Sequence, residues 1–255
     1  MVVNIIISFA FGSIIGSFLN VLIHRLPREE SVIFPQSHCP HCKKNIAWFD
    51  NIPIISFIML GGKCRSCKNN ISPRYIFIEI LTGLFFSLLS TYYGFNELGF
   101  YAFAFFISSL IAASFSDIEH GIIPDELIFI GIPAGFLFNY FSNNLASSII
   151  GCLAGFLSLY LIGQIGKFAY KKEALGFGDV KLAALMGAWL LPDKLLLALF
   201  LGYALAAVWV VFLMVFKIKK FGDTIPFGPG LSIGAIISLF WGGAIINFYL
   251  ARCFN

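Results

Sequence analysis

Long apolar segments dominate the sequence and restrict its possible folds more than any other feature. A helix needs roughly 20 apolar residues to cross a bilayer. The 255 residues are 59% hydrophobic and 12% charged, whereas soluble domains are about 45–50% apolar and about 25% charged. We therefore predict an all-α polytopic membrane protein with about eight transmembrane helices, at 3–23, 75–93, 98–117, 125–141, 146–168, 179–192, 194–216 and 226–249.

The positive residues are distributed unevenly between the two sides that this arrangement creates. Of the 17 Lys and Arg residues, all but Lys194 and Arg252 fall in segments that share one side, at 24–74, 167–181 and 217–225. Loops rich in lysine and arginine stay in the cytoplasm. We therefore expect this side to be cytoplasmic and both termini to lie on the other side.

Residues 24–74 form the one sizeable polar segment, and it contains two Cys-x-x-Cys motifs. They are Cys39-Pro40-His41-Cys42 and Cys64-Arg65-Ser66-Cys67. Each motif can present two thiolates to one metal ion, which favours a tetrahedral structural zinc site made by Cys39, Cys42, Cys64 and Cys67. Two disulfides are the alternative, but a reducing cytoplasm disfavours them. His38 or His41 could replace one cysteine, although we interpret both as neighbours of the site.

Two aspartates interrupt apolar runs on the side that is expected to be cytoplasmic. Asp179 follows two glycines at the start of a predicted helix, in Gly176-Phe177-Gly178-Asp179, and Asp117 ends another helix. A carboxylate at the edge of the hydrocarbon is costly and indicates function, while glycines allow another chain to approach closely. Alone, Asp179 could be a helix cap and Asp117 a charge in headgroup water. Together they favour a carboxylate pair that shares a proton and activates water.

Polar residues in the first two apolar runs are further candidates for functional side chains. Asn20 and His24 lie four residues apart and share a predicted helix face, which fits either a binding site or an interhelical hydrogen bond. Glu79 lies about one turn inside the second run, where a carboxylate should be paired or protonated. A basic partner and a catalytic role both remain open for it.

In this order the motifs resemble those of the bacterial type IV prepilin peptidases, which are membrane aspartic proteases with a Gly-x-Gly-Asp motif. The resemblance covers almost the whole chain. Besides the two cysteine motifs, it rests on Gly16-Ser17-Phe18-Leu19-Asn20-Val21, His24-Arg25-Leu26-Pro27, Asp50-Asn51-Ile52-Pro53, Gly61-Gly62-Lys63-Cys64, Asp117 with Ile123-Pro124-Asp125, Gly176-Phe177-Gly178-Asp179-Val180-Lys181 and Ile225-Pro226-Phe227-Gly228-Pro229.

The resemblance implies an enzyme with two activities. Asp117 and Asp179 would be the catalytic pair, and Gly176, Gly178, Pro124 and Asp125 would support it. Family members cleave the basic leader of type IV prepilins and type II secretion pseudopilins after a glycine. The long form with cysteines also methylates the new N-terminal residue, using S-adenosylmethionine. No Gly-x-Gly-x-x-Gly loop indicates where this cofactor binds, so we look near Asn20, Arg25, Gly62 and Glu79.

The resemblance also implies an organisation and a location. We expect a first transmembrane helix at 1–23, a cytoplasmic zinc segment linked to methyl transfer at 24–74, and a peptidase bundle at 75–255. The protein would be a multi-pass protein of the bacterial inner membrane, with periplasmic termini and with the zinc segment and the aspartates at the cytoplasmic face. Its partners would include membrane lipid but no nucleic acid.

Two alternatives remain. A transporter or channel could use intramembrane acids to bind protons or cations. Both aspartates, however, are predicted at helix ends on one face, which favours chemistry on a peptide. The other alternative is a peptidase that has lost methyl transfer, and the four intact cysteines speak against it.

Overall fold

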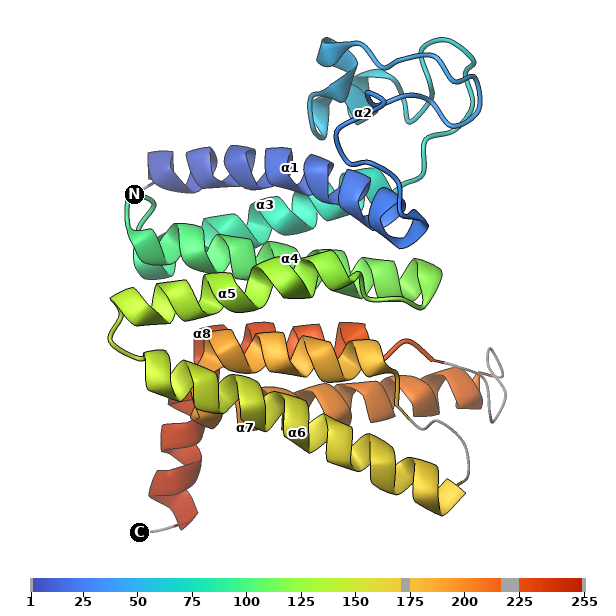
Figure 1. Ribbon diagram of the computed structural model, residues 1–255. Helices are drawn as coiled ribbons and strands as arrows, with labels where there is room; N and C mark the ends of the chain where they lie inside the picture. Colours follow the sequence, from blue (N-terminus) through green and yellow to red (C-terminus); the bar gives the residue numbers. More distant parts are fainter. Residues whose placement is uncertain (1, 171–174, 217–224, 254–255) are drawn as a thin grey trace. The chain divides into compact units, whose positions relative to one another are not determined.

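The computed structural model describes residues 2–170, 175–216 and 225–253. Two short 3₁₀ turns, Leu26–Arg28 and Trp48–Asn51, accompany eight helices in this part of the chain: α1 (Val2–Arg25), α2 (Ile55–Met59), α3 (Arg74–Tyr93), α4 (Leu98–His120), α5 (Asp125–Phe141), α6 (Leu145–Tyr170), α7 (Phe177–Val215) and α8 (Gly228–Cys253) (Figure 1). The described residues form no strand, only the isolated bridges His38–Asn45 and Lys63–Asn70. The all-α prediction is therefore confirmed.

The helices account for the predicted membrane spans. By length and composition, six of the described helices are able to cross a membrane. α5, with 17 residues, lies at the lower limit of spanning length. α7 is broken at Leu191, whose φ of 64° and ψ of 168° are not helical, inside the turn expected between the sixth and seventh spans. Counting α5 and both halves of α7 gives eight segments at the expected places.

The chain divides into two compact units, which are described separately. Unit 1 comprises Met1–Ala112 and unit 2 comprises Ala113–Asn255. The lysine-rich stretches at 171–172 and 217–220, on which part of the expected sidedness depends, lie outside the described residues. The division at 1–23, 24–74 and 75–255 and the sidedness stay predictions.

In unit 1, α1 and α3 pack at very short range because two glycines of α1 face α3. A Cβ added at Gly12 would lie 2.8 Å from the Gly83 Cα, and one at Gly16 would lie 2.8 Å from the Glu79 Cα. Small residues four apart allow membrane helices to approach in this way. The residues of α3 around Glu79 are thereby fixed against α1.

In unit 2, α7 is the element on which α5, α6 and α8 pack. The interfaces of α6 and α8 with α7 include direct backbone contacts. A Cβ at Gly155 would overlap the Ala183 backbone, and one at Gly234 would overlap the Ala198 carbonyl. Gly131 of α5 faces the Leu185 side chain in the same way. The first half of α7, which begins two residues before Asp179, is therefore held from several sides.

The break in α7 is accommodated by neighbouring polar side chains. Pro192 has no N–H, so the carbonyl of Ala188 loses its helical donor. Asn139 Nδ2 donates to this carbonyl at 3.0 Å and Ser148 Oγ at 2.5 Å. Irregular backbone at membrane depth needs such partners. The chain then reverses direction, and the second half of α7 runs back toward the end at which the first half began (Figure 1).

Candidate functional site

Asp117 lies one turn before the end of α4, not at the end as the sequence suggested. Asp117 is 9% exposed. The chain turns sharply after the helix, because Gly121 has a φ of +65° and its N–H donates to the Asp117 carbonyl at 2.9 Å. Ser116 Oγ also donates to the Ile122 carbonyl at 2.7 Å. These bonds fold the following loop back, and Ile123 becomes buried.

Asp179 is the third residue of α7, since the helix begins at Phe177 with Gly176 as its N-cap. It is therefore not the cap itself. The Gly176 backbone interacts with its carboxylate, an arrangement typical of acidic residues at this helix position. Gly178 faces Ile123 of the loop after α4, and a Cβ there would lie 3.3 Å from the Ile123 Cβ. Gly178 thus allows the start of α7 to lie close to the chain that follows Asp117.

The structure brings Asp117 and Asp179 together within unit 2. Asp179 is 8% exposed, and the two carboxylates are close enough for their charges to interact. Asp117 Oδ2 accepts a hydrogen bond of 2.8 Å from the N–H of Gly228, the first residue of α8. The N-terminus of a helix favours such an anion. A Cβ at Gly228 would lie 2.9 Å from Asp117 Oδ2, so glycine is what permits this contact.

Asp125 and Pro124 have supporting positions. Pro124 is the N-cap of α5, and Asp125 is its first residue. The Asp125 carboxylate binds Lys181 Nζ at 2.5 Å, and its side chain is 49% exposed. Lys181 also lies over the Phe177 ring, 4.9 Å from its centroid. This ion pair joins the start of α5 to the start of α7, outside the carboxylate pair.

Sequence reasoning missed one polar group near the aspartates, Tyr203 in the second half of α7. Its hydroxyl is buried without a hydrogen-bond partner among the described residues, and it is close enough to Asp179 to interact with its charge. Only the reversal at Leu191 brings the two residues together. The predicted turn was the one signal that could have suggested Tyr203.

The four cysteines of unit 1 form one cluster. One sulfur atom from each of Cys39, Cys42, Cys64 and Cys67 lies within 4.8 Å of the others, and all four are free thiols. The Cys39 and Cys67 sulfurs are 3.8 Å apart. A tetrahedron of sulfurs about 2.3 Å from a zinc ion has edges of about 3.8 Å. The donor set therefore fits zinc, and neither His38 nor His41 belongs to it.

The two cysteine motifs have the same backbone conformation. In each, the N–H of the residue four positions after the first cysteine donates to the carbonyl of that cysteine, Lys43 to Cys39 at 2.9 Å and Lys68 to Cys64 at 3.0 Å. Both lysines have positive φ, 58° and 60°. Such paired knuckles orient two thiols each toward a shared centre.

Backbone hydrogen bonds favour a thiolate at Cys64, the first cysteine of the second motif. The backbone of Cys67 and that of Ser66 form hydrogen bonds to the Cys64 sulfur, and they lower the pKa of the Cys64 thiol to about 6. Metals bind the thiolate form. Arg65 donates to both carboxylate oxygens of Asp50, at 2.7 and 2.6 Å, and its hydrogen bond holds the pKa of Asp50 below the usual range.

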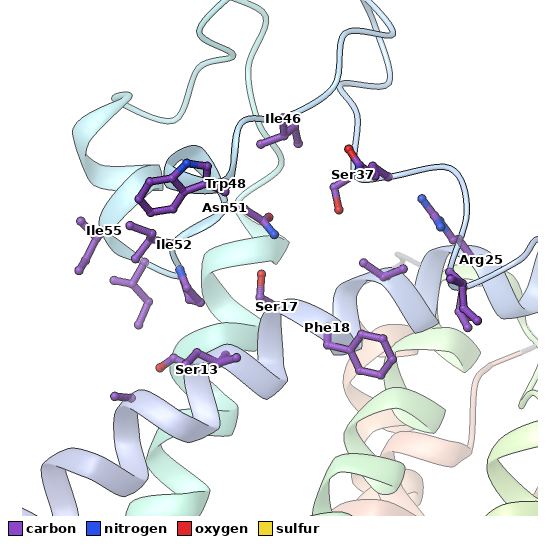
Figure 2. Close-up of a pocket in the computed structure, with 18 of the residues that line it drawn as sticks. Ser13, Ser17, Phe18, Arg25, Ser37, Ile46, Trp48, Asn51, Ile52 and Ile55 are labelled. Carbon is purple, nitrogen blue, oxygen red and sulfur yellow. The ribbon is translucent and has the colours of Figure 1, made fainter.

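A groove of about 970 Å³ lies in unit 1, between one face of α1 and the segments that precede and follow the first cysteine motif. Figure 2 shows Ser13, Ser17 and Phe18 on the α1 side and Trp48, Asn51 and Ile52 opposite. Its lining is mainly apolar, with a few hydroxyl and amide groups. Pockets of this size and character commonly bind small molecules.

Glu79 and Arg25 hold the walls of this groove. The Glu79 carboxylate accepts the Ile54 N–H at 2.7 Å and interacts with the Ser17 side chain. Ile54 has a φ of 63°, which is strained for a β-branched residue. Arg25 lines the groove and donates to the carbonyls of Ser31 and Pro35, at 2.9 and 2.7 Å.

The other two cofactor candidates, Asn20 and Gly62, also belong to unit 1. Asn20 donates to the Gly16 and Tyr75 carbonyls at 3.2 Å each, and its buried Oδ1 has no partner among the described residues. Gly62 has a φ of +66° and faces the Phe57 ring. Of the four candidates, Arg25 is the one whose side chain lines the groove.

Taken together, the helices, the buried carboxylates and the thiol cluster define a polytopic membrane protein with two chemically distinct candidate sites. Family comparison makes this specific. The model of the bacterial peptidase A24 N-terminal domain matches residues 10–93, and that of the type IV leader peptidase family matches residues 104–211.

Several curated relatives match the chain over nearly its whole length. The prepilin leader peptidase/N-methyltransferase of Pseudomonas aeruginosa is 33% identical, over 96% of this chain and 93% of that protein. Its namesake from Dichelobacter nodosus is 35% identical, over 92% and 91%. The type 4 prepilin-like proteins leader peptide-processing enzyme of Escherichia coli O78:H11 is 37% identical, over 90% and 91%.

The chain belongs to the type IV leader peptidase family. This membership confirms the family expected from the sequence motifs and the expectation of an enzyme, and it gives no support to a transporter or channel. No solved structure matches the chain.

Proposed function

We propose that this protein removes the leader of type IV prepilins and type II secretion pseudopilins after a glycine and then methylates the new N-terminal residue. The names of the relatives support both activities. The observation that carries the peptidase half is the approach of two buried aspartates from separate helices, with Asp117 bound to the N-terminus of α8. The proposal also places the protein in the bacterial inner membrane, with its active face in the cytoplasm and its termini in the periplasm. The distribution of Lys and Arg supports this orientation.

The carboxylate pair supplies what peptide hydrolysis needs. Two carboxyl groups in a buried site tend to share one proton. The ionised member takes a proton from water, whose oxygen attacks the scissile carbonyl carbon, while the protonated member gives its proton to the carbonyl oxygen. A proton then passes to the leaving nitrogen as the C–N bond breaks. No covalent intermediate with the enzyme forms.

The glycines of the motif have distinct uses in this reaction. Gly178 permits the close packing of α7 on Ile123, which positions Asp179. Gly176 lies beside the Asp179 carboxylate, and a Cβ there would be 3.3 Å from Oδ2. The space next to the carboxylate is thereby left to the extended backbone of the substrate.

Methyl transfer belongs to unit 1 in this proposal. S-adenosylmethionine, when bound, supplies the methyl group. The groove of about 970 Å³ fits a cofactor of this type, because the Trp48 ring offers a surface for adenine and Ser37, Asn51 and Gln36 offer hydrogen bonds. Arg25 and Glu79 shape the groove walls. A structural zinc in the thiol cluster would stabilise the segment that forms the wall of the groove opposite α1.

The two halves can be separated experimentally by presenting two substrates, a prepilin and a pilin already freed of its leader, to membranes that carry the protein. Asp179→Asn should leave the prepilin intact and still methylate the pilin. Cys39→Ser combined with Cys64→Ser should show the reverse. Loss of both activities in each variant, with normal amounts of inserted protein, would contradict the assignment of two sites.

A further inference from the structure

The hydroxyl of Tyr203 is a buried polar group that the reaction described above does not use. Its oxygen has no hydrogen-bond partner among the described residues. Buried hydroxyl groups almost always have a partner, so an exception needs a physical explanation. Its position beside a proposed catalytic carboxylate suggests that the partner arrives with the substrate.

The fold places Tyr203 at the level of Asp179. α7 reverses at Leu191 (Figure 1), Asp179 lies twelve residues before this point, and Tyr203 lies twelve residues after it. Equal lengths of helix rise by equal amounts, so the two side chains come to the same end of the α7 hairpin. The interaction of the hydroxyl with the Asp179 charge agrees with this position.

Packing fixes the Tyr203 ring. Its centroid is 5.0 Å from that of Phe227, with the planes tilted by 47°. Phe227 directly precedes Gly228, whose N–H binds Asp117. The helices are also close here, since a Cβ at Gly202 would lie 3.0 Å from the Leu231 Cα. One short segment therefore positions both Asp117 and the Tyr203 ring.

We propose that Tyr203 is a further catalytic residue, whose hydroxyl donates a hydrogen bond to the oxygen of the scissile carbonyl. This inference rests on the proposed peptidase function. The carbonyl oxygen has two acceptor positions, so it can accept from Tyr203 while it receives the proton of an aspartate. The phenol keeps its own proton throughout. A fixed donor in a buried site acts most strongly on the charge that develops on this oxygen in the transition state.

Tyr203→Phe tests the proposal, because it removes the hydroxyl and keeps the ring that packs on Phe227. Steady-state cleavage of a prepilin should show kcat reduced by roughly 10- to 100-fold, somewhat less than the loss of a main oxyanion donor, with KM nearly unchanged. The matched control is Tyr160→Phe in α6, which removes a hydroxyl and keeps the ring that stacks on Phe156. This variant should cleave at the wild-type rate. Equal resistance of all variants to limited proteolysis confirms that they are folded.

A wild-type kcat in Tyr203→Phe, or a change confined to KM, would overturn the proposal. Asp179→Asn in the same series separates this failure from that of the proposed function. If the wild type cleaves and Asp179→Asn does not, a normal Tyr203→Phe removes only the role of Tyr203. If Asp179→Asn cleaves normally, the carboxylate pair and the role of Tyr203 fall together.

Discussion

The thiol cluster of unit 1 and the carboxylate pair of unit 2 are assembled in different ways. In the cluster, each half is a local knuckle whose backbone bonds span four residues, and the two knuckles repeat one conformation. The carboxylates lie 62 residues apart in sequence, and α4, α7 and the start of α8 position them. A local motif carries its own geometry, whereas a pair of this kind exists only when the helices have packed.

This difference implies that the two sites respond to different changes. The cluster should depend on its metal and on the short segment around it. The carboxylate pair should depend on close contacts between helices.

Gly228→Ala should disturb the carboxylate pair alone. Its Cβ would lie 2.9 Å from Asp117 Oδ2, so the carboxylate must move away from the α8 amide. We expect cleavage to slow by about 100-fold, as for the loss of one preorganised electrostatic contact, while methylation of a leaderless pilin continues. The measurement is the rate of each reaction in the same membranes.

Gly243→Ala is the matched control for this change. It lies on the same helix, and a Cβ there would meet nothing within 4 Å. Its cleavage rate should equal that of the wild type. A loss as large as that of Gly228→Ala would show that any change in α8 impairs the enzyme.

Removal of the metal should affect the cluster alone. Because a structural zinc supplies folding free energy to its segment, a chelator should lower methyl transfer by at least about tenfold, the scale on which supporting metal-site contacts act. Leader cleavage should persist. Metal content and both reaction rates can be followed during chelation and after addition of zinc. A parallel fall in both rates would remove the contrast between the sites.

Glu79→Ala should have a smaller effect, also confined to unit 1. It leaves the Ile54 N–H without its acceptor, which costs about 1–3 kcal/mol and permits the strained residue to relax. We expect faster proteolysis at residues 46–55 and weaker methylation. Glu79→Gln keeps an acceptor oxygen and should lie between this variant and the wild type. Identical proteolysis of all three proteins would show that Glu79 does not hold the groove wall.

Asp125→Asn should have the smallest effect on cleavage. The partly exposed pair with Lys181 contributes about 0–1 kcal/mol, so we expect less than about a fivefold change in rate. Lys181→Met removes the other member of the ion pair, and its cleavage rate should change as little as that of Asp125→Asn. A loss on the scale of Asp179→Asn would place Asp125 in the catalytic pair and would change the assignment.

Much of the fold could be predicted because apolar runs of membrane length are a direct consequence of the bilayer. The break at Leu191-Pro192 was also visible, since proline removes a helical donor. The helix boundaries were less accurate. α7 begins two residues before Asp179 because Gly176 serves as N-cap, and α4 continues to His120, beyond Asp117.

The thiol cluster could be predicted from the sequence more fully than the carboxylate pair. The cluster is built from local motifs, whereas the pair depends on the packing of helices that are distant in sequence. The four cysteines could be grouped from local spacing, and the cluster contains these four residues. The aspartates could be paired only through their motifs, and they stay a proposal. The roles of Gly228, Lys181 and Tyr203 were not accessible, because each depends on a contact between segments that are distant in sequence.

The most direct test of the account is mass spectrometry of a prepilin incubated with S-adenosylmethionine and membranes that carry the wild type, Asp117→Asn or Asp179→Asn. We predict that the wild type yields a product without leader and with one added methyl group, and that both variants leave the leader in place. Full cleavage by both asparagine variants would contradict the central claim that these two carboxylates carry out the reaction.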